Sequence, residues 1–513
     1  MAAKIQTLLK SGPASLALIA VICLAAFVWY YPGEAPTGDA AYKYLQVKDF
    51  INGGYRGFAC DYPGREIDPA FQWFPFQEPM AYIIDGQCFY VFPYQLIFVY
   101  LPFYLLAGNV GIYLVSLLTG WLILLMIYRI GGQLGFDEPH RAGLVWFSFA
   151  AYGLLTYALG MNEFALTGLL ALTAAYCALL PGVLPAVFGG ICVGIALQFR
   201  AESALLGCTI PAAIWLFAPD DGRRSRAVVF FAVFALILGA FFLANQAVFG
   251  HPLGLRGIVF IEGQQQSVLD RLLRMLEYWA GRPTAIFINT PVFVLVPLAL
   301  WALFRPGSDS PGGDQRAYLR MFGMIAVSYG VVVPLAVANY PGSQFGERFI
   351  FNVYPLLGIL AFSVLVGGWF PGSVSLWIRR VAILLVAGTV LYTGVYLGTA
   401  RYVDRGFHTT SRLMEAGAEG TEVIIFRNYV MVNGAFAHFH ARPGFLATDD
   451  ESFHELIARL RAHDVKRVTV AHSSPAYRAH LGLDPNFVPV DFQYVSRSDD
   501  LGNELIELRR FEL

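Results

Sequence analysis

The sequence has little charge, few cysteines and none of the common nucleotide or hydrolase motifs. Only 14% of its 513 residues are charged, against about 25% in soluble domains, which excludes a soluble enzyme and a disordered chain. Six cysteines without a CxxC pair exclude a disulfide scaffold and give no sign of zinc. GxxxxGK[ST], GxGxxG before a helix, HExxH and GxSxG are absent. Because 35 basic residues nearly balance 36 acidic ones, no surface for nucleic acid is expected.

Long apolar runs dominate what is present, since 57% of the residues are hydrophobic. A helix needs about 20 apolar residues to cross a bilayer with every backbone polar group satisfied internally. Twelve runs approach this length: 13–31, 89–106, 110–128, 143–160, 165–181, 184–199, 203–218, 227–249, 284–304, 321–338, 349–369 and 381–399. The sequence therefore predicts an all-α polytopic membrane protein.

Basic residues predict the direction of these helices. Lys4 and Lys10 precede the first run, which favours a cytoplasmic N-terminus. The basic loops at 129–141, 223–226, 305–320 and 379–380 all become cytoplasmic only if the run 89–106 does not span. Because Pro93 and Pro102 interrupt that aromatic run, we expect an interfacial or shallow re-entrant helix there. This leaves about 11 transmembrane helices and an extracytoplasmic C-terminus.

Composition divides the chain into two predicted domains. Residues 1–399 form the transmembrane domain, which includes a first extracytoplasmic loop at 32–109. Charge returns to soluble levels near Arg401, and residues 400–513 are expected to form a small α/β domain outside the cytoplasm. Its expected elements are strands at 423–426 and 467–470, a helix at 452–462 and an extended segment at 487–495. No internal repeat is evident, which weakens the interpretation as a transporter.

In this topology, polar residues that could carry chemistry gather at the outer face of the membrane. Ionisable side chains near the hydrocarbon are costly and often functional. The group comprises Asp39, Glu163, Arg200, Glu202, His251, Arg256, Glu262, Gln344, Glu347 and Arg348. Structural interpretations compete: Asp39 and His251 as ordinary loop residues, and Glu163 with Arg200 as a buried pair.

Arg348 is informative because it opens a predicted helix, the unfavourable end for a cation. A bound anion would remove the conflict, and so would a carboxylate such as Glu347 or Glu262. A lipid-linked phosphate suits an outer site without nucleotide motifs. Its tail would lie between helices, arginines would hold the phosphate as it leaves, and a carboxylate would take a proton from the acceptor hydroxyl.

The layout of these residues resembles the GT-C superfamily of glycosyltransferases. The resemblance rests on Asp39 after the first span, the long first loop with Phe92-Pro93 and Leu101-Pro102-Phe103-Tyr104, Glu163 in an outer turn, and the C-terminal domain. The subgroup it resembles contains the protein O-mannosyltransferases and the bacterial lipid A aminoarabinose transferase. It implies inverting transfer from a polyprenyl-phosphate sugar to a lipid, glycan or protein acceptor, at the periplasmic face of a bacterial inner membrane.

The resemblance also implies roles for single residues. Asp39 would be the catalytic base and Glu163 the second acid. Arg200, Arg348 and Lys43 would bind the donor phosphate. Substrate or metal contacts would come from a further set: Glu202, His251, Glu262, Gln344 and Glu347.

The cofactor is left open by the same resemblance. No cofactor is certain, and a divalent cation is the candidate because some relatives bind one with the second acid. This chain has Met161-Asn162-Glu163 where the mannosyltransferases often have Arg-x-Asp.

Two features of the first loop complete the expectations. Glu66 and Asp68, with Trp73, Phe74 and Phe76, would line the acceptor entrance, or would simply pack the loop. Cys60 and Cys88 are the only cysteines outside the predicted spans, and an oxidising periplasm would allow them to form a disulfide.

Three other functions compete with glycosyl transfer. A transporter or flippase of lipid-linked or small polar substrates should carry its polar residues near the bilayer midplane rather than at one face. A polysaccharide polymerase or ligase typically carries its main loop late in the chain, whereas here it comes first. A non-catalytic scaffold leaves the one-sided cluster unexplained.

The topology yields a direct prediction. A reporter that is active only in the periplasm, fused after Leu513, should be active because the C-terminus is predicted to lie outside the cytoplasm. The same reporter fused within 305–320 is the matched control and should be inactive. An inactive reporter after Leu513 would contradict the count of eleven spans.

Overall fold

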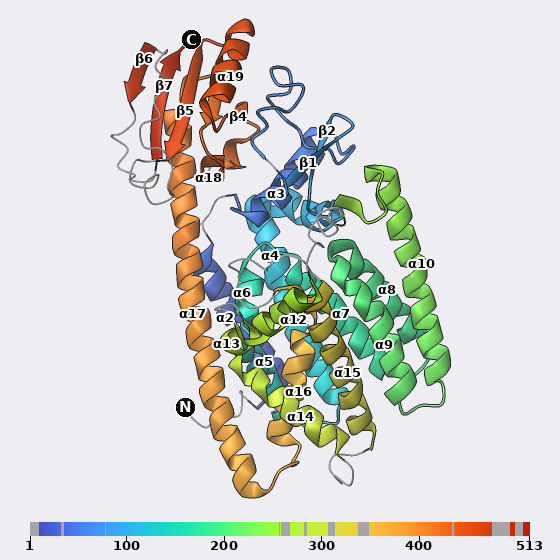
Figure 1. Cartoon of the computed structure of the whole chain (residues 1–513). Coiled ribbons are helices and arrows are strands. Elements are labelled where there is room, and N and C mark those ends of the chain that lie inside the picture. Colours follow the sequence, from blue (N-terminus) through green and yellow to red (C-terminus); the bar gives the residue numbers. More distant parts are fainter. Residues whose placement is uncertain are drawn as a thin grey trace. The chain divides into compact units, whose positions relative to one another are not determined.

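The computed structural model describes residues 10–31, 35–76, 78–255, 257, 267–281, 285–305, 313–336, 348–432, 436–473, 493–497 and 506–513 (Figure 1). Its contacts divide the chain into two compact units. Unit 1 contains Met1–Tyr31 and Gly111–Gly398, and unit 2 contains Pro32–Val110 and Thr399–Leu513. Two long helices, α4 (Leu96–Gln133) and α17 (Gly372–Gly417), contribute residues to both units.

Unit 1 is helical, as expected from its apolar runs. Besides parts of α4 and α17, its described elements are α2 (Gly12–Tyr30), α5 (Glu138–Ala151), α6 (Leu154–Leu159), α7 (Phe164–Leu179), α8 (Val183–Phe199), η1 (Ala201–Ser203), α9 (Ala204–Phe217), α10 (Arg223–Phe249), α12 (Val268–Leu276), η2 (Glu277–Gly281), α13 (Ile286–Asn289), η3 (Pro291–Val294), α14 (Leu295–Phe304), α15 (Gly313–Ala336), η4 (Arg348–Val353) and α16 (Tyr354–Val366).

Several of these helices are suited to a bilayer. Among the described residues, six helices are long and apolar enough to cross one, and a seventh span results if the pair Val268–Asn289 and Pro291–Phe304, bent by 108°, is counted. Three further apolar helices are shorter: Phe164–Leu179, Val183–Phe199 and Ala201–Phe217. The chain is thus a multi-pass membrane protein by length and composition, while the count of eleven spans stays a prediction.

Several predicted runs are interrupted in the structure, and two of them are informative. The run 143–160 is divided into α5 and α6 at Tyr152 and Gly153, where Gly153 adopts a left-handed conformation at φ 61°. The run 89–106 was expected as one helix, but its first residues end strand β2 (Gln87–Tyr90), and α4 begins only at Leu96. Pro93 explains this correction, because proline cannot continue the preceding strand ladder and favours a turn. A further break at Ala107 and Gly108 separates residues 96–106 from the rest of α4.

Glycines allow α8 and α10 to pack closely. A β-carbon added at Gly190 would lie 2.7 Å from the Phe230 carbonyl oxygen, and one added at Gly194 would lie 2.7 Å from Ile237. Only glycine permits this approach, which is a common way of packing helices in membranes. The two helices lie side by side in Figure 1.

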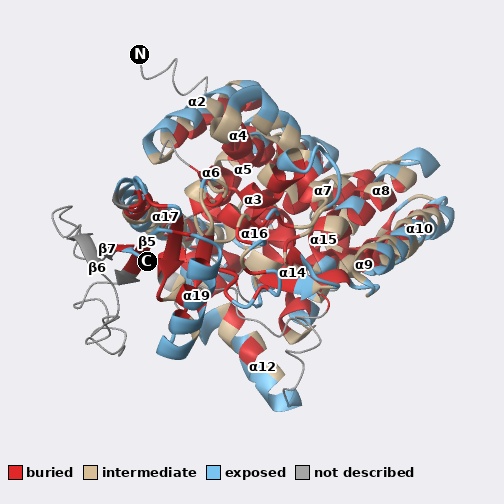
Figure 2. Cartoon of the chain, turned by 90° about the horizontal axis from the view of Figure 1, so that it is seen from above, coloured by how far each residue is buried: buried red, intermediate tan, exposed pale blue. Residues whose placement is uncertain are grey.

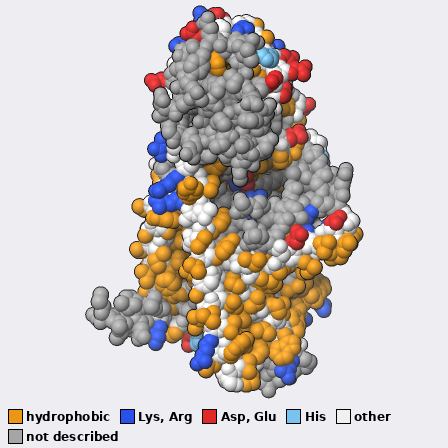
Figure 3. Space-filling view, turned by 60° about the vertical axis from the view of Figure 1, so that its left-hand side comes forward, with side chains coloured by type: hydrophobic (Ala, Val, Ile, Leu, Met, Phe, Trp, Pro, Cys, Tyr) orange, Lys and Arg blue, Asp and Glu red, His pale blue; other side chains and the backbone are white. Residues whose placement is uncertain are grey.

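The outer surfaces of the unit 1 helices are hydrophobic. Leu236 of α10 is 77% exposed and Leu384 of α17 is 72% exposed, whereas α16 is buried along nearly its whole length (Figure 2). On the face drawn in Figure 3, hydrophobic side chains cover the helices and few charged ones interrupt them. Exposed leucines of this kind are stable in contact with lipid chains.

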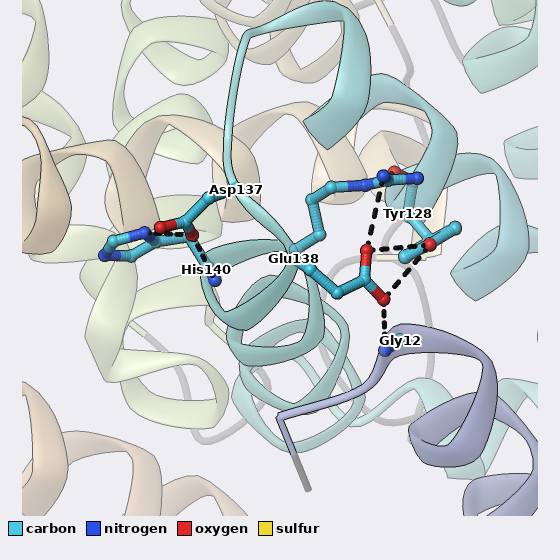
Figure 4. A network of polar contacts seen from close by, with 6 residues as sticks. Gly12, Tyr128, Asp137, Glu138 and His140 are labelled. Carbon is cyan, nitrogen blue, oxygen red and sulfur yellow. Dashed lines mark hydrogen bonds and ion pairs between the residues drawn. The ribbon is translucent and has the colours of Figure 1, made fainter. Parts of the chain in front are cut away.

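A polar network fixes the start of α2 against α5 (Figure 4). A carboxylate oxygen of Glu138 accepts a hydrogen bond from the Gly12 backbone N–H at 2.7 Å, and the Tyr128 hydroxyl donates to the same carboxylate at 3.0 Å. Arg141 pairs with Glu138 at 3.3 Å and stacks over the Tyr128 ring. The Gly12 N–H belongs to the first turn of α2 and has no partner within its own helix. Glu138 therefore supplies an acceptor that the helix lacks.

Unit 2 combines the first loop with the C-terminal segment. The loop contributes α3 (Asp39–Asn52) and an antiparallel hairpin of β1 (Ala81–Ile84) and β2. The C-terminal segment forms a five-stranded sheet in the order β4-β3-β5-β7-β6, from β3 (Val423–Phe426), β4 (Gly444–Leu446), β5 (Arg467–Ser473), β6 (Gln493–Arg497) and β7 (Ile506–Glu512). β3 is parallel to β4 and β5, while β7 is antiparallel to β5.

The predicted α/β character of the tail is confirmed. Strands at 423–426 and 467–470 and the helix at 452–462 correspond to β3, β5 and α19 (Asp450–Ala462). Part of the expected extended segment, 487–492, lies outside the described residues, and β6 begins at Gln493. Two short pieces, α18 (Tyr429–Val432) and η5 (Phe436–His438), follow β3.

The predicted division into domains at residue 399 stays a prediction. In the structure, residues 32–110 and 399–513 form one compact unit. Contacts of the loop were not evident from composition, because they join residues several hundred positions apart.

Glu138 provides a test of the network around α2. Replacement by alanine leaves a backbone N–H of α2 without its acceptor, which typically costs about 1–3 kcal/mol. Glu138→Ala should therefore lower the melting temperature of the detergent-solubilised chain. Glu138→Gln is the matched control and should cost less, because its amide oxygen still accepts from Gly12. Equal melting temperatures for wild type and Glu138→Ala would contradict this account.

Candidate functional site

The turn that carries Glu163 is shaped by its neighbour Asn162. The Asn162 amide donates to the carbonyls of Tyr157 and Gly160 at 3.0 and 3.1 Å, and its side-chain oxygen accepts from the Phe164 N–H at 3.1 Å. These bonds end α6 and begin α7, as expected of an asparagine near a helix N-terminus. The turn thus holds Glu163 just before the first residue of α7.

Arg200 binds two carboxylates in the interior of unit 1. It follows α8, and its guanidinium lies 3.2 Å from a Glu163 oxygen and 2.5 Å from a Glu202 oxygen. Glu163 is 1% exposed and Arg200 4% exposed. Buried ions are stable only when they are paired and hydrogen-bonded. The predicted pair of Glu163 and Arg200 is therefore present, with Glu202 as a second partner.

Arg348 lies close to this group across two aromatic rings. The Arg200 guanidinium is 4.4 Å from the ring centre of Phe164 and 4.8 Å from that of Phe349. The Arg348 guanidinium is 5.7 and 5.3 Å from the same two centres. Both guanidinium groups thus lie near the same two aromatic rings. Aromatic rings attract cations, most strongly where water is partly excluded. We call Glu163, Arg200, Glu202 and Arg348 the charged cluster.

Hydrogen bonds behind the cluster join distant helices. The Asn352 amide donates to the Ser203 hydroxyl at 3.1 Å and to the Tyr329 hydroxyl at 2.8 Å. These residues belong to η4, η1 and α15, and Asn352 and Tyr329 are buried. The bonds hold the segment that begins with Arg348 against the segment that follows Arg200.

Sequence reasoning overlooked the residues that organise the cluster. Phe164 follows Glu163 directly, and Phe349 follows Arg348 directly. An aromatic residue next to a candidate charge was the available signal for the shared rings. Nothing in the sequence alone pointed to Asn352, since its partners lie 149 and 23 residues away.

The other predicted site residues of unit 1 divide into two groups. His251 follows α10 in a turn and accepts a hydrogen bond from the Leu253 N–H at 3.3 Å, so its visible role is local. The remaining ones lie outside the described residues: Arg256, Glu262, Gln344 and Glu347. Their roles stay predictions.

Asp39 is the first residue of α3 in unit 2 and is partly exposed. A carboxylate at a helix N-terminus interacts favourably with the helix dipole. Gly38 precedes it with φ 57°, a conformation that glycine adopts without strain. Lys43, one turn further, is buried, and its ammonium lies 4.9 Å from the ring centre of Phe92. Because Asp39 and Lys43 belong to unit 2, their convergence with the charged cluster stays a prediction.

Other polar side chains of α3 contact the C-terminal segment. The Tyr42 and Tyr429 hydroxyls are 2.5 Å apart, and Asp49 pairs with His440. Burial raises the pKa of Asp49, and the hydrogen bond from His440 acts in the opposite direction. Burial and the Asp49 carboxylate raise the pKa of Tyr90 well above its usual value, so this phenol stays protonated.

The loop residues proposed for the acceptor entrance are largely structural. The Asp68 carboxylate accepts from the Tyr62 hydroxyl and from the backbone N–H groups of Gln72 and Trp73, at 3.1, 2.8 and 2.9 Å. Asp68, Trp73, Phe74 and Phe76 are all buried. For these four residues, the packed-loop interpretation is the one that the structure bears out. The expected disulfide between Cys60 and Cys88 is present.

The described residues offer few suitable ligands for a metal ion. No group of three His, Cys, Asp or Glu side chains among them could hold one. The Glu163 carboxylate is hydrogen-bonded to Arg200, whose charge opposes that of a cation at the same place. The surroundings of Glu163 therefore do not fit a divalent cation.

Comparison with known proteins identifies the fold. ArnT from Cupriavidus metallidurans in the apo state has 14% identity and a TM-score of 0.57, over 96% of this chain and 97% of that one. The structure of that protein bound to undecaprenyl phosphate gives a TM-score of 0.56 over the same shares of both chains, again at 14% identity. The chain has the GT-C glycosyltransferase fold.

A structurally similar archaeal protein supports the same conclusion about the fold. The oligosaccharyltransferase AglB from Archaeoglobus fulgidus, in complex with an inhibitory peptide and a dolichol-phosphate, has 12% identity and a TM-score of 0.53. The match covers 90% of this chain and 69% of AglB. Another structure of the Archaeoglobus enzyme contains zinc and sulfate. No family model and no curated protein sequence matches this chain.

The charged cluster predicts an asymmetry between its members. Arg200→Met removes the cation that binds the buried carboxylate of Glu163 and the partly buried one of Glu202, and breaking a buried pair in this way typically costs about 3–5 kcal/mol. Glu163→Gln leaves Arg200 paired with Glu202 and should cost much less. Melting temperature and the monodisperse fraction in detergent measure both effects. A Glu163→Gln variant as unstable as Arg200→Met would contradict the assigned role of Glu202.

Proposed function

We propose that this chain is a membrane glycosyltransferase that transfers a sugar from a polyprenyl-phosphate donor to a hydroxyl acceptor at the periplasmic face of a bacterial inner membrane. The observation that carries the proposal is the charged cluster, with two guanidinium groups at helix ends, within a GT-C fold. ArnT and AglB were solved with undecaprenyl phosphate and dolichol-phosphate, which supports a lipid phosphate as donor here. A transporter or flippase has no comparable support.

Arg348 and Arg200 are assigned to the donor phosphate. A guanidinium donates two parallel hydrogen bonds to phosphate oxygens and keeps its charge at any physiological pH. Glu163 and Glu202 already bind Arg200, so we assign these carboxylates the task of orienting that guanidinium. Arg348 is then the residue whose loss should weaken donor binding most directly. Lys43 stays a candidate for the same phosphate.

Asp39 is assigned the role of base in an inverting transfer. Its carboxylate takes the proton of the acceptor hydroxyl while the hydroxyl oxygen bonds to the anomeric carbon of the donor. The bond between that carbon and the phosphate oxygen breaks, and its electron pair leaves with the polyprenyl phosphate. Attack opposite the leaving group inverts the configuration. The arginines stabilise the charge that develops on the departing phosphate.

Replacement of Asp39 tests the mechanism. The purified full chain is incubated with a panel of undecaprenyl-phosphate-linked hexoses and pentoses and with envelope extract as acceptor. The wild type should release undecaprenyl phosphate from one donor, and Asp39→Asn should lose at least about 100-fold in turnover, as expected for a missing general base. Asp61→Asn, an exposed carboxylate of the same loop, is the matched control and should remain active.

Arg348→Ala provides the second variant of this experiment. Loss of a charged hydrogen bond typically costs about 1.5–3 kcal/mol, so the KM for the donor should rise about 10- to 100-fold. Arg56→Ala, an exposed arginine of the first loop, should leave the KM unchanged. Near wild-type turnover by Asp39→Asn would remove Asp39 from the mechanism. If the wild type uses no donor of the panel, the proposed function is wrong.

A further inference from the structure

One face of α3 carries a row of polar side chains. Asp39, Tyr42, Gln46 and Asp49 are spaced by three, four and three residues, so they lie on the same side of the helix. Tyr42 is 2% exposed, and Gln46 and Asp49 are each 5% exposed. Buried polar groups are costly unless they find partners. For Tyr42 and Asp49, the partners come from the C-terminal segment.

The partner of Tyr42 is Tyr429, at 2.5 Å between hydroxyl oxygens. The Tyr42 ring also packs edge-on against Phe436, with 4.9 Å between ring centres. Burial raises the pKa of both tyrosines, and the charge of Asp39 acts in the same direction on each. Both phenols therefore stay protonated.

Further contacts hold the two ends of α3. Asp49, ten residues after Asp39, pairs with His440, and their side chains are 3% and 17% exposed. Before the helix, the Thr37 hydroxyl donates to Asp404 of α17 at 2.7 Å. We call Asp404, Tyr429, Phe436 and His440 the C-terminal clamp. These four residues come from three separate pieces of the chain after position 400, and all contact α3 or the residues just before it.

We propose that the C-terminal clamp positions Asp39 for proton transfer, with Tyr429 and His440 as the decisive positioning residues. The inference rests on the proposed function, because it assumes that Asp39 is the base. Asp39 is the first residue of its helix, where helices fray and a side chain is least restrained. A displacement of about 1 Å at a reacting group can cost 100-fold in rate. The clamp restrains α3 within one turn of Asp39 at Tyr42 and again at Asp49.

A kinetic experiment separates positioning from general stability. Tyr429→Phe and Tyr42→Phe each remove one side of the hydroxyl pair and should lower kcat about 10-fold, with the KM for the undecaprenyl-phosphate sugar that the wild type uses changed less than about twofold. The double variant should resemble either single one, because residues that act through one shared bond are not additive. Tyr62→Phe is the matched control, since Tyr62 is a buried tyrosine of the same unit that bonds to Asp68.

A second measurement needs no substrate. Amide hydrogen exchange of the full chain should be faster in the peptide 39–46 of Tyr429→Phe and His440→Gln than in wild type, because α3 loses a restraint. His438→Gln is the matched control: this histidine is two residues from His440 and pairs with Glu415 at 3.6 Å. It should leave exchange in 39–46 and kcat unchanged.

The outcomes distinguish the clamp from the proposed function. Wild-type kcat in Tyr429→Phe and His440→Gln overturns the clamp, whether or not exchange in α3 is faster. An equal loss of kcat in Tyr62→Phe also overturns it, because general destabilisation would then explain the effect. Full activity of Asp39→Asn would show that Asp39 is not the base, and the clamp would then have no base to position. If Asp39→Asn is inactive and Tyr429→Phe is unaffected, the positioning role of the clamp is wrong while the proposed function stands.

Discussion

The buried guanidinium of Arg200 is the interaction on which the rest of unit 1 depends. A charge taken out of water is stable only with a close opposite charge, and Arg200 has two, on Glu163 and Glu202. Those carboxylates come from the turn before α7 and from η1, so charge compensation alone requires the ends of α7, α8 and η1 to meet. The rings of Phe164 and Phe349 then bring the Arg348 segment to the same place.

Unit 2 also has buried polar groups that need partners. Helix α3 buries several polar side chains, among them Tyr42, Lys43, Gln46 and Asp49, and each needs a partner that water would otherwise supply. Tyr429 and His440 serve two of them, while the Gln46 amide donates to the Phe92 carbonyl at 2.8 Å. The helix that begins with Asp39 is thereby attached to a β-strand domain some 400 residues further along the chain. Polar contacts therefore join this helix to the C-terminal segment.

Much of the fold followed from hydrophobic run lengths. Apolar runs predicted the helices of unit 1, since a backbone in hydrocarbon must satisfy its hydrogen bonds within each segment. Short strand-like stretches in the tail predicted β3 and β5. Only the start of the helix expected at 89–106 was wrong, because composition does not reveal that Pro93 separates a hairpin strand from a helix. Sequence alone left two interpretations for Asp68, an acceptor entrance or a packed loop, and its carboxylate accepts three hydrogen bonds within the loop.

The sequence by itself determined the membrane class, the helix segments and the residue types available at the turns between them, because run length and charge are local properties. It also indicated Glu163, Arg200 and Arg348 as members of one group, since charges near a bilayer must be compensated. Only the tertiary structure decided that Glu202 shares Arg200 with Glu163, that Phe164 and Phe349 stack with both arginines, and that Tyr429 and His440 meet α3. Glu202 is only two residues from Arg200, but the longest of these pairings, between Asp49 and His440, joins residues 391 positions apart. Their partners are chosen by packing in three dimensions, which no local pattern encodes.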